Sequence, residues 1–419
     1  MVGTGVLGRL RSICGDAYAR LAGPADAVAG VPARWVAAPG GVDALSEVLA
    51  VAAGDGLAVL ARGAATKLDW GAPPAALDVI VDTGRLAGPP EHVAGDPVAT
   101  VRAGTPLRAL RASLARAGQR VPLDPASERA SGTVGGVLAT GEAGPLRLTH
   151  GRPHDVVAGV EFVRADGALA HAGGRVVKTV GGYDLGRLVC GSYGTLGIVT
   201  AATLRLDPVP AARAWVLRTV RSPMEASDLT VRLLASPLAP AAVEVDLPAT
   251  GFGTLGVLLE GSPAGVTARA AAARQLVDAG EAAVLDEPPP WWGRYPFGSD
   301  DIALKIVAPV ADLHAAIYAL RDAAGRLVPV PVRGSAGAGV VYAALAGDLD
   351  VARVVAILYG VRATLLVRGG SCAVLRAPPA VRGEIDTWGP VPGLALMHRV
   401  KEQFDPQRRL APGRLPGGI

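Results

Sequence analysis

Residues 173–200, GGRVVKTVGGYDLGRLVCGSYGTLGIVT, carry the most distinctive pattern in this 419-residue chain. Eight glycines lie between Gly173 and Gly197. Two other glycine-rich stretches come earlier, ARGAATKLDWG at residues 61–71 and ASGTVGGVLATGEAG at residues 130–144. Glycine permits left-handed backbone and close approach of a ligand to the main chain. Three such clusters in a region otherwise typical of strands indicate a large, flat ligand whose phosphates are bound by backbone N–H donors.

Composition excludes several classes of protein. The length favours two or three domains, and 50% hydrophobic residues exclude an intrinsically disordered chain. The 41 basic and 37 acidic residues give a net charge of only +4 without a basic run, so we expect no nucleic-acid partner. The cysteines, Cys14, Cys190 and Cys372, are far apart and form no C-x-x-C motif. We therefore predict no disulfide framework, no metal site and no iron–sulfur cluster in this chain.

No segment of the sequence has the pattern of a signal peptide or of a membrane span. The start, Met1–Leu10, lacks a charged region followed by a continuous apolar core. The strongest apolar stretch, Val351–Val367, is interrupted by Arg353 and Arg362. We expect a cytoplasmic protein, with peripheral attachment to the inner membrane through partners as the open alternative.

The first half of the chain alternates strands and helices. Apolar periodicity predicts helices over residues 42–53 and 106–117, each preceded by a short strand. Asp166-Gly167 is a favoured two-residue turn, which predicts a β-hairpin. Asp184 is a good N-cap for a helix that begins at the next residue.

The pattern changes after Pro208-Val209-Pro210, where we place a domain boundary. An order of strand, helix, strand, strand, helix follows and then recurs, which indicates ferredoxin-like α/β units with an antiparallel sheet. The predicted helices are 224–234, 263–279, 311–323 and 348–359, and the last predicted strand is ATLLVRGG at residues 363–370.

The three glycine-rich stretches and the tail FDPQRRLAPGRL at residues 404–415 resemble the vanillyl-alcohol oxidase, or para-cresol methylhydroxylase (PCMH), type of FAD-binding family. Within it they look like the FAD-binding subunits of bacterial glycolate oxidase. The resemblance implies an α+β fold, with a two-subdomain PCMH-type FAD-binding domain followed by a ferredoxin-like α/β cap domain with an antiparallel sheet. The implied divisions are an N-terminal helical segment at 1–31, the FAD-binding domain at 32–210, the cap at 211–395 and a C-terminal segment at 396–419 that returns to the FAD domain.

The same resemblance implies where FAD would bind. The pyrophosphate loop would be Arg62, Gly63, Ala64, Ala65, Thr66 and Lys67. The pyrophosphate and the flavin side would also meet Ser131, Thr133, Gly135, Gly136 and Gly141, and backbone groups of Ile198 would meet the adenine end. Two alanines replace glycines that the family loop usually carries, at a cost wherever φ must be positive. No histidine lies in this loop, so we predict noncovalent FAD.

The substrate site is less well marked. A 2-hydroxy acid needs an arginine for its carboxylate and a histidine or tyrosine near its hydroxyl. The candidates are Arg152, His154 and Tyr183, each with a structural alternative. We expect a flavin-binding subunit that acts on a small 2-hydroxy acid or another alcohol, together with a sister flavin subunit and an iron–sulfur subunit. Two alternatives stay open: a self-sufficient oxidase or dehydrogenase, and a structural subunit with a degenerate flavin pocket.

Overall fold

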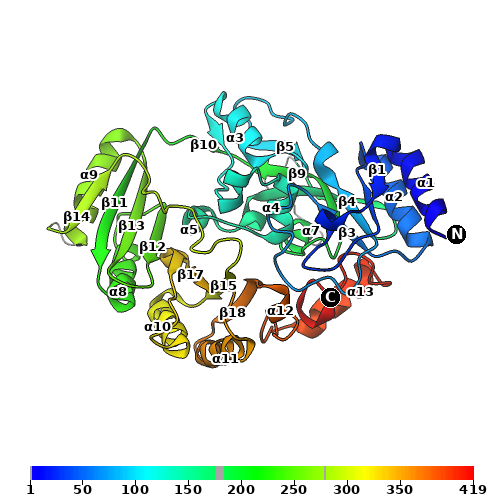
Figure 1. Ribbon diagram of the computed structural model, residues 1–419. Helices are drawn as coiled ribbons and strands as arrows, with labels where there is room; N and C mark the ends of the chain where they lie inside the picture. The colour runs from blue at the N-terminus through cyan, green and yellow to red at the C-terminus, as the bar shows by residue number, and fades with distance from the viewer. Residues whose placement is uncertain (1, 175–183, 278–279) are drawn as a thin grey trace. The chain divides into compact units, whose positions relative to one another are not determined.

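The computed structural model describes residues 2–174, 184–277 and 280–419 (Figure 1). The chain forms two compact units. Unit 1 consists of Met1–Ala143, Arg152–Val209 and Val391–Ile419, and unit 2 consists of Gly144–Gly151 and Pro210–Pro390. Tyr183, one of the candidate residues for the substrate site, lies outside the described residues.

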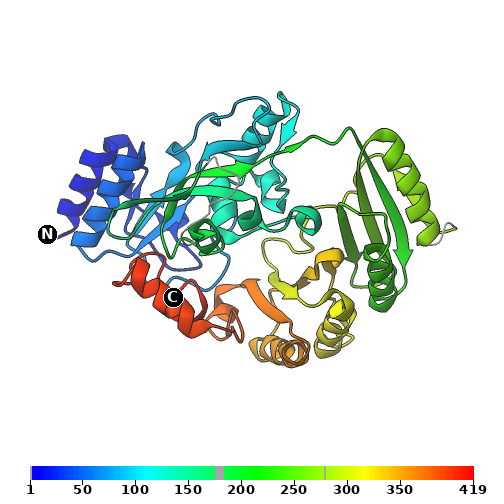
Figure 2. The ribbon, with the colours of Figure 1, turned by 180° about the vertical axis from the view of Figure 1, so that it is seen from behind.

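Unit 1 contains a small, mostly parallel sheet in the order β1-β2-β4-β3. Its strands are β1 (Ala19–Leu21), β2 (Trp35–Ala37), β3 (Val59–Arg62) and β4 (Val79–Asp82), of which only β1 runs antiparallel to its neighbour. Helices α1 (Val2–Cys14) and α2 (Val42–Gly54) lie side by side at this sheet (Figure 2). Leu45, Val48 and Leu49 of α2 are fully buried, because their spacing places them on one face of the helix.

A second sheet of unit 1 is antiparallel, in the order β5-β9-β7-β8. Leu107, Leu110 and Leu114 of α3 bury one helix face in its core, together with Phe162. The strands are β5 (Val98–Arg102), β7 (Val157–Val163), β8 (Leu169–Gly173) and β9 (Ile198–Arg205), and the short pair β6 (Gln119–Arg120) and β10 (Asp207–Pro208) is separate. The helices are α3 (Leu107–Ala115), α4 (Val134–Thr140), α6 (Pro153–Val156), α7 (Leu185–Val189) and α13 (Leu394–Phe404).

Unit 2 is built from two similar halves, each with the order β-α-β-β-α-β. One antiparallel sheet of eight strands unites them in the order β14-β11-β13-β12-β16-β17-β15-β18, so the two halves meet where β12 pairs with β16. The first half contains β11 (Ala212–Val220), α8 (Pro223–Leu234), β12 (Ala242–Leu247), β13 (Gly253–Gly261), α9 (Pro263–Leu276) and β14 (Ala282–Leu285). The second contains β15 (Ile302–Val307), α10 (Leu313–Ala324), β16 (Val332–Ser335), β17 (Val340–Leu345), α11 (Val351–Val367) and β18 (Ser371–Arg376). The recurrence expected from the sequence is therefore confirmed.

The helices α8 to α11 share one hydrophobic core with one face of this sheet. Alternation along each strand decides which side chains enter the core. On β12, Val243 and Val245 are core residues, whereas Glu244 and Asp246 point to the opposite face. Two short helices complete unit 2, α5 (Arg147–His150) and α12 (Pro379–Arg382).

Two details of the sequence prediction are wrong. Residues 363–370 were expected to form a strand, but α11 continues to Val367 and the strand is β18. The apolar residues that α11 buries, Val354, Ile357, Leu358, Val361 and Leu365, keep helical spacing through this segment. The hairpin between β7 and β8 is closed by paired Arg164 and Ala168, so its turn has three residues rather than two.

Candidate functional site

The strongest candidate site is a pocket in unit 1 at the end of β3. The loop that follows β3 lines it with residues 63–68. The facing wall comes from Thr133 and Gly136 at the start of α4, with Thr140 further along. Five of the residues expected in the pyrophosphate loop and two of those expected opposite it are therefore brought together.

The backbone of this loop has unused donors. Within the described parts of the chain, the N–H groups of Ala64, Ala65, Thr66 and Lys67 donate to no protein acceptor. Ala65 adopts a left-handed conformation, with φ 59°, which is uncommon for a residue with a side chain. Consecutive N–H groups with such a kink form a concave nest that suits an anion. The residues present therefore fit the diphosphate of a dinucleotide.

The loop and α4 approach each other closely at Gly63. A Cβ atom at this position would lie 2.4 Å from Oγ1 of Thr133. That hydroxyl also caps α4 by accepting a hydrogen bond of 3.2 Å from the N–H of Gly136. Gly63 thus allows the loop to pack against the start of α4, which closes this side of the pocket.

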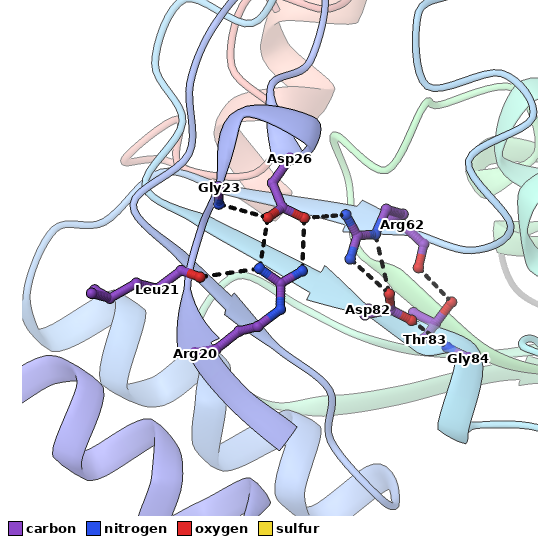
Figure 3. A network of polar contacts seen from close by, with 8 residues as sticks. All are labelled: Arg20, Leu21, Gly23, Asp26, Arg62, Asp82, Thr83 and Gly84. Atoms are coloured by element: carbon purple, nitrogen blue, oxygen red, sulfur yellow. Dashed lines mark hydrogen bonds and ion pairs between the residues drawn. The ribbon is translucent and has the colours of Figure 1, made fainter. Parts of the chain in front are cut away.

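The Arg62 side chain is directed to two carboxylates rather than to the pocket (Figure 3). Its guanidinium donates to Asp26 at 2.8 Å and to Asp82 at 2.9 and 3.1 Å. Asp26 also accepts from Arg20 at 2.7 and 3.0 Å. These hydrogen bonds, first those from Arg20 and then that from Arg62, hold the pKa of the Asp26 carboxyl far below its ordinary value although burial opposes them. Arg62 therefore fixes the strand that presents the loop.

The other residues expected near FAD do not line this pocket. Ser131, with φ 61°, ends the 3₁₀ helix η4 (Ala126–Ala130), and Gly141 ends α4. Gly135 packs against Ala103, which lies 2.8 Å from the position of a Cβ atom. Ile198 is buried at the start of β9, where it pairs with Val163. Their expected contacts with the cofactor stay predictions.

Arg152 and His154 lie at the short helix α6 and do not line the pocket either. The backbone N–H of Arg152 donates to Asp155 at 2.9 Å, and Nε2 of His154 lies 3.3 Å from the same carboxylate. Burial lowers the pKa of the His154 imidazole, and Asp155 opposes this effect. Their catalytic roles stay predictions, as does that of Tyr183.

Sequence reasoning missed three residues around the pocket. Tyr193, with φ 55°, and Arg414 line it, and Arg414 donates to the carbonyl of Trp70 at 2.5 Å. Glu142 lies behind the loop, where it pairs with Lys67 at 2.5 Å. The only sequence signals were the tail motif around Arg414 and the glycine-rich contexts of the other two. Contacts between distant segments could not be derived from either.

The C-terminal tail reaches this region by pairing with β3. Val59 donates to Arg409 at 2.8 Å and accepts from Ala411 at 2.7 Å. Lys401 of α13 is fully buried and donates to Asp405, to the carbonyl of Thr195 and to the carbonyl of Leu410, at 2.7 to 2.9 Å. These bonds hold the tail beside the strand that carries the loop.

A second polar cluster lies on the face of the unit 2 sheet opposite to the helices α8 to α11. Tyr342 is directly opposite Arg333 on one side and Lys305 on the other, so the three side chains share this face. Arg333 pairs with Asp246 at 2.8 Å, and Arg147 donates to the Tyr342 hydroxyl at 3.3 Å. In the described ranges no group of three or more His, Cys, Asp or Glu side chains could hold a metal ion, and no helix is long and apolar enough to cross a membrane.

Most of the segment that matches a known family lies in unit 1. Residues 33–173 match the family described as FAD binding domain. The prediction of FAD as cofactor is thus confirmed for this domain, which contains the loop and the facing residues of α4, whereas Tyr193 and Arg414 lie outside it.

Some relatives match part of the chain and others match nearly all of it. D-2-hydroxyglutarate dehydrogenase of Xanthomonas citri pv. viticola is 37% identical over 191 residues, covering 44% of this chain and 40% of that protein. Glycolate oxidase subunit GlcE of Escherichia coli (strain K12) is 41% identical over 123 residues, 29% of this chain and 35% of that protein. The chain thus spans less than half the length of these relatives. An uncharacterized FAD-linked oxidoreductase of Mycobacterium tuberculosis is 26% identical over 457 residues, 97% of this chain and 96% of that protein.

A solved structure shows the same fold. Alkyldihydroxyacetonephosphate synthase is similar with a TM-score of 0.67 over 91% of this chain and 77% of that chain, at 16% identity. The predicted α+β fold class, with a PCMH-type FAD-binding fold and ferredoxin-like units in an antiparallel sheet, is confirmed.

Proposed function

We propose that the chain is an FAD-dependent oxidoreductase that acts on the CH–OH group of a small 2-hydroxy acid, as the flavin-binding subunit of a complex of the glycolate oxidase type. The observation that carries the proposal is the nest of four unpaired N–H donors, which lies inside the region matched to the FAD binding domain. Relatives named for D-2-hydroxyglutarate and glycolate support the substrate class.

The loop residues supply binding rather than chemistry. The N–H groups of Ala64 to Lys67 would hold the diphosphate, and the Thr133 hydroxyl caps α4 next to the loop. When bound, FAD supplies acceptance of a hydride equivalent, and the protein orients it. No histidine lies in the loop, so FAD would be held without a covalent bond to it.

Partners would carry electrons away from the flavin. Cys14, Cys190 and Cys372 are far apart in the sequence, which does not suit an iron–sulfur cluster in this chain. We therefore propose a sister flavin subunit and an iron–sulfur subunit as partners. The resemblance to a subunit of glycolate oxidase supports this arrangement.

A self-sufficient dehydrogenase is the second candidate, and the polar cluster around Tyr342 in unit 2 favours it. The cluster offers positive charge for the carboxylate of a 2-hydroxy acid, from Arg333, Lys305 and Arg147. It also offers the hydroxyl group of Tyr342. This set lies within one unit, so a single chain could bind a carboxylate without a partner subunit.

Anaerobic reduction of the purified chain separates the two candidates. Glycolate, D-lactate and D-2-hydroxyglutarate are each mixed with the FAD-loaded chain, alone and with its co-purified partners, while the flavin absorbance is followed. The subunit proposal expects bleaching only with partners present. Rapid bleaching by the isolated chain would support the second candidate, and no bleaching in either preparation would contradict both.

A further inference from the structure

Lys67 closes the phosphate loop, yet its side chain points into the protein. The side chains of Lys67 and Glu142 are 4% and 0% exposed. The Lys67 ammonium donates to Oε2 of Glu142 at 2.5 Å and to the Ser127 hydroxyl at 2.6 Å. The other oxygen of Glu142 accepts from the backbone N–H of Ser127 at 3.1 Å. Three segments of unit 1 therefore meet in one buried polar cluster: the loop after β3, η4 and the turn after α4.

A buried ammonium requires a compensating charge, because removing one partner leaves the other charge without solvation. Glu142 supplies that charge and both of its oxygens are engaged. The positive charge of Lys67 is thus neutralised inside the protein, whereas its N–H group belongs to the nest. The loop offers the ligand main-chain donors rather than a free cation.

We propose that Glu142 is a positioning residue for the dinucleotide site. Its carboxylate fixes Lys67, and through it the end of the loop, so that the N–H donors of Ala64 to Lys67 converge on the phosphates. This inference rests on the proposed binding of FAD. The proposal predicts that loss of the Glu142 carboxylate weakens FAD binding. Simple electrostatics predicts the opposite, because removing a carboxylate near a bound dianion should tighten binding.

FAD titration of the apoprotein tests the assignment. We expect Glu142→Gln to weaken FAD binding by about tenfold or more, because its NH2 group would face either the Lys67 ammonium or the Ser127 N–H and the Lys67 charge would have no counter-charge. Glu47→Gln is the matched control: it removes an exposed carboxylate on α2 and leaves the affinity unchanged. Affinity in Glu142→Gln equal to or tighter than wild type would overturn the proposal.

A double variant keeps the proposal testable if Glu142→Gln fails to fold. Lys67→Met with Glu142→Met replaces the buried ion pair by apolar side chains, a change that proteins often tolerate. We expect the packed methionines to hold the end of the loop in place of the ion pair, so that FAD affinity stays within about threefold of wild type. The dependence on salt concentration should be unchanged, because the Lys67 charge does not face the phosphates. A double variant that binds as weakly as Lys67→Met alone, with a smaller salt dependence, would assign Lys67 a direct phosphate contact and refute the proposal.

The wild-type titration distinguishes failure of the proposed FAD binding from failure of the positioning role of Glu142. If wild-type protein takes up FAD and Glu142→Gln binds it equally well, only the positioning role fails. If wild-type protein takes up no FAD, the proposed function fails and the positioning role falls with it.

Discussion

Ala65 holds a left-handed backbone conformation in the middle of the phosphate loop. This conformation costs a residue with a Cβ atom about 1–2 kcal/mol of folding free energy. Glycine avoids that cost, but it loses more conformational entropy on folding, which cancels part of the gain. We expect Ala65→Gly to stabilise the protein by about 0.5–1 kcal/mol, measured by chemical denaturation. Ala64 is the matched control, since its φ is not positive, and Ala64→Gly should be neutral or destabilising. Stabilisation by Ala64→Gly but not by Ala65→Gly would contradict this explanation.

Asp26 predicts a pH dependence of stability. In the folded protein its pKa lies below the ordinary value of 3.8, so the unfolded chain binds more protons in the interval between the two values. The stabilisation by Asp26 is therefore complete above about pH 5 and is lost as the pH falls through that interval. Asp26→Asn should lower the free energy of unfolding by about 1.5–3 kcal/mol at pH 7, and the difference from wild type should shrink toward pH 3. Urea denaturation across this pH range tests both, and a constant difference would count against the Arg20 and Arg62 contacts.

Single residues show how far the sequence alone could lead. Asp184 was expected to cap a helix, and its side chain does accept from the N–H of Arg187 at 3.0 Å. Capping is local, so a short window of sequence contains all the information it needs. The pairing of Lys67 with Glu142 joins positions 75 residues apart, and no local pattern indicates it.

At the scale of elements, the contact between the loop and α4 gives a steric prediction. Gly63→Ala places a methyl group 2.4 Å from Oγ1 of Thr133, so the loop must shift. We expect FAD affinity to fall about tenfold and stability to fall by about 1–3 kcal/mol. Adding Thr133→Ala removes the clashing oxygen and should restore most of the affinity. Thr133→Ala alone should cost about 1 kcal/mol through the lost cap.

Gly54→Ala at the end of α2 is the control for the added methyl group, because a Cβ atom there meets nothing within 4 Å. It should leave FAD affinity unchanged. If Thr133→Ala fails to rescue Gly63→Ala, the contact does not shape the pocket.

The C-terminal helix and tail depend on one buried ion pair. Lys401 and Asp405 are both fully buried, and burial lowers the pKa of the lysine while its hydrogen bond with Asp405 opposes this effect. We expect Lys401→Met to destabilise the protein by about 3–5 kcal/mol, because it leaves the Asp405 carboxylate buried without a cation. Chemical denaturation measures this cost. Exposed ion pairs usually contribute less than about 1 kcal/mol to stability. A loss that small in Lys401→Met would show that the pair does not anchor the tail.

The helices and strands of unit 2 could be predicted because their apolar residues recur with a clear helical or strand spacing. The exception, the strand expected at residues 363–370, has a physical reason. The run Thr364 to Val367 is short, apolar and partly β-branched, which is compatible with a strand. Leu365 continues the buried face of α11, and packing against the core decides for helix. The order of the strands in the sheet could not be predicted from the sequence, because the pairing of β12 with β16 depends on long-range packing.

For the whole molecule, the two halves of unit 2 and the FAD binding domain of unit 1 could be anticipated from recurrence and motifs. The pocket walls could not, because they combine the loop after β3, α4, Tyr193 and the C-terminal tail. These segments span most of the chain, and only the folded structure brings them together. The substrate depends on side chains whose roles the family motif does not specify.

Binding of FAD by the purified chain can be measured from its visible spectrum. Apoprotein is incubated with FAD, freed of excess cofactor by gel filtration and denatured to release what it bound, and the visible spectrum is recorded before and after. We expect about one FAD per chain, released intact on denaturation because the cofactor is held noncovalently. A colourless protein after incubation would rule out FAD as its bound cofactor and favour a structural subunit with a degenerate flavin pocket.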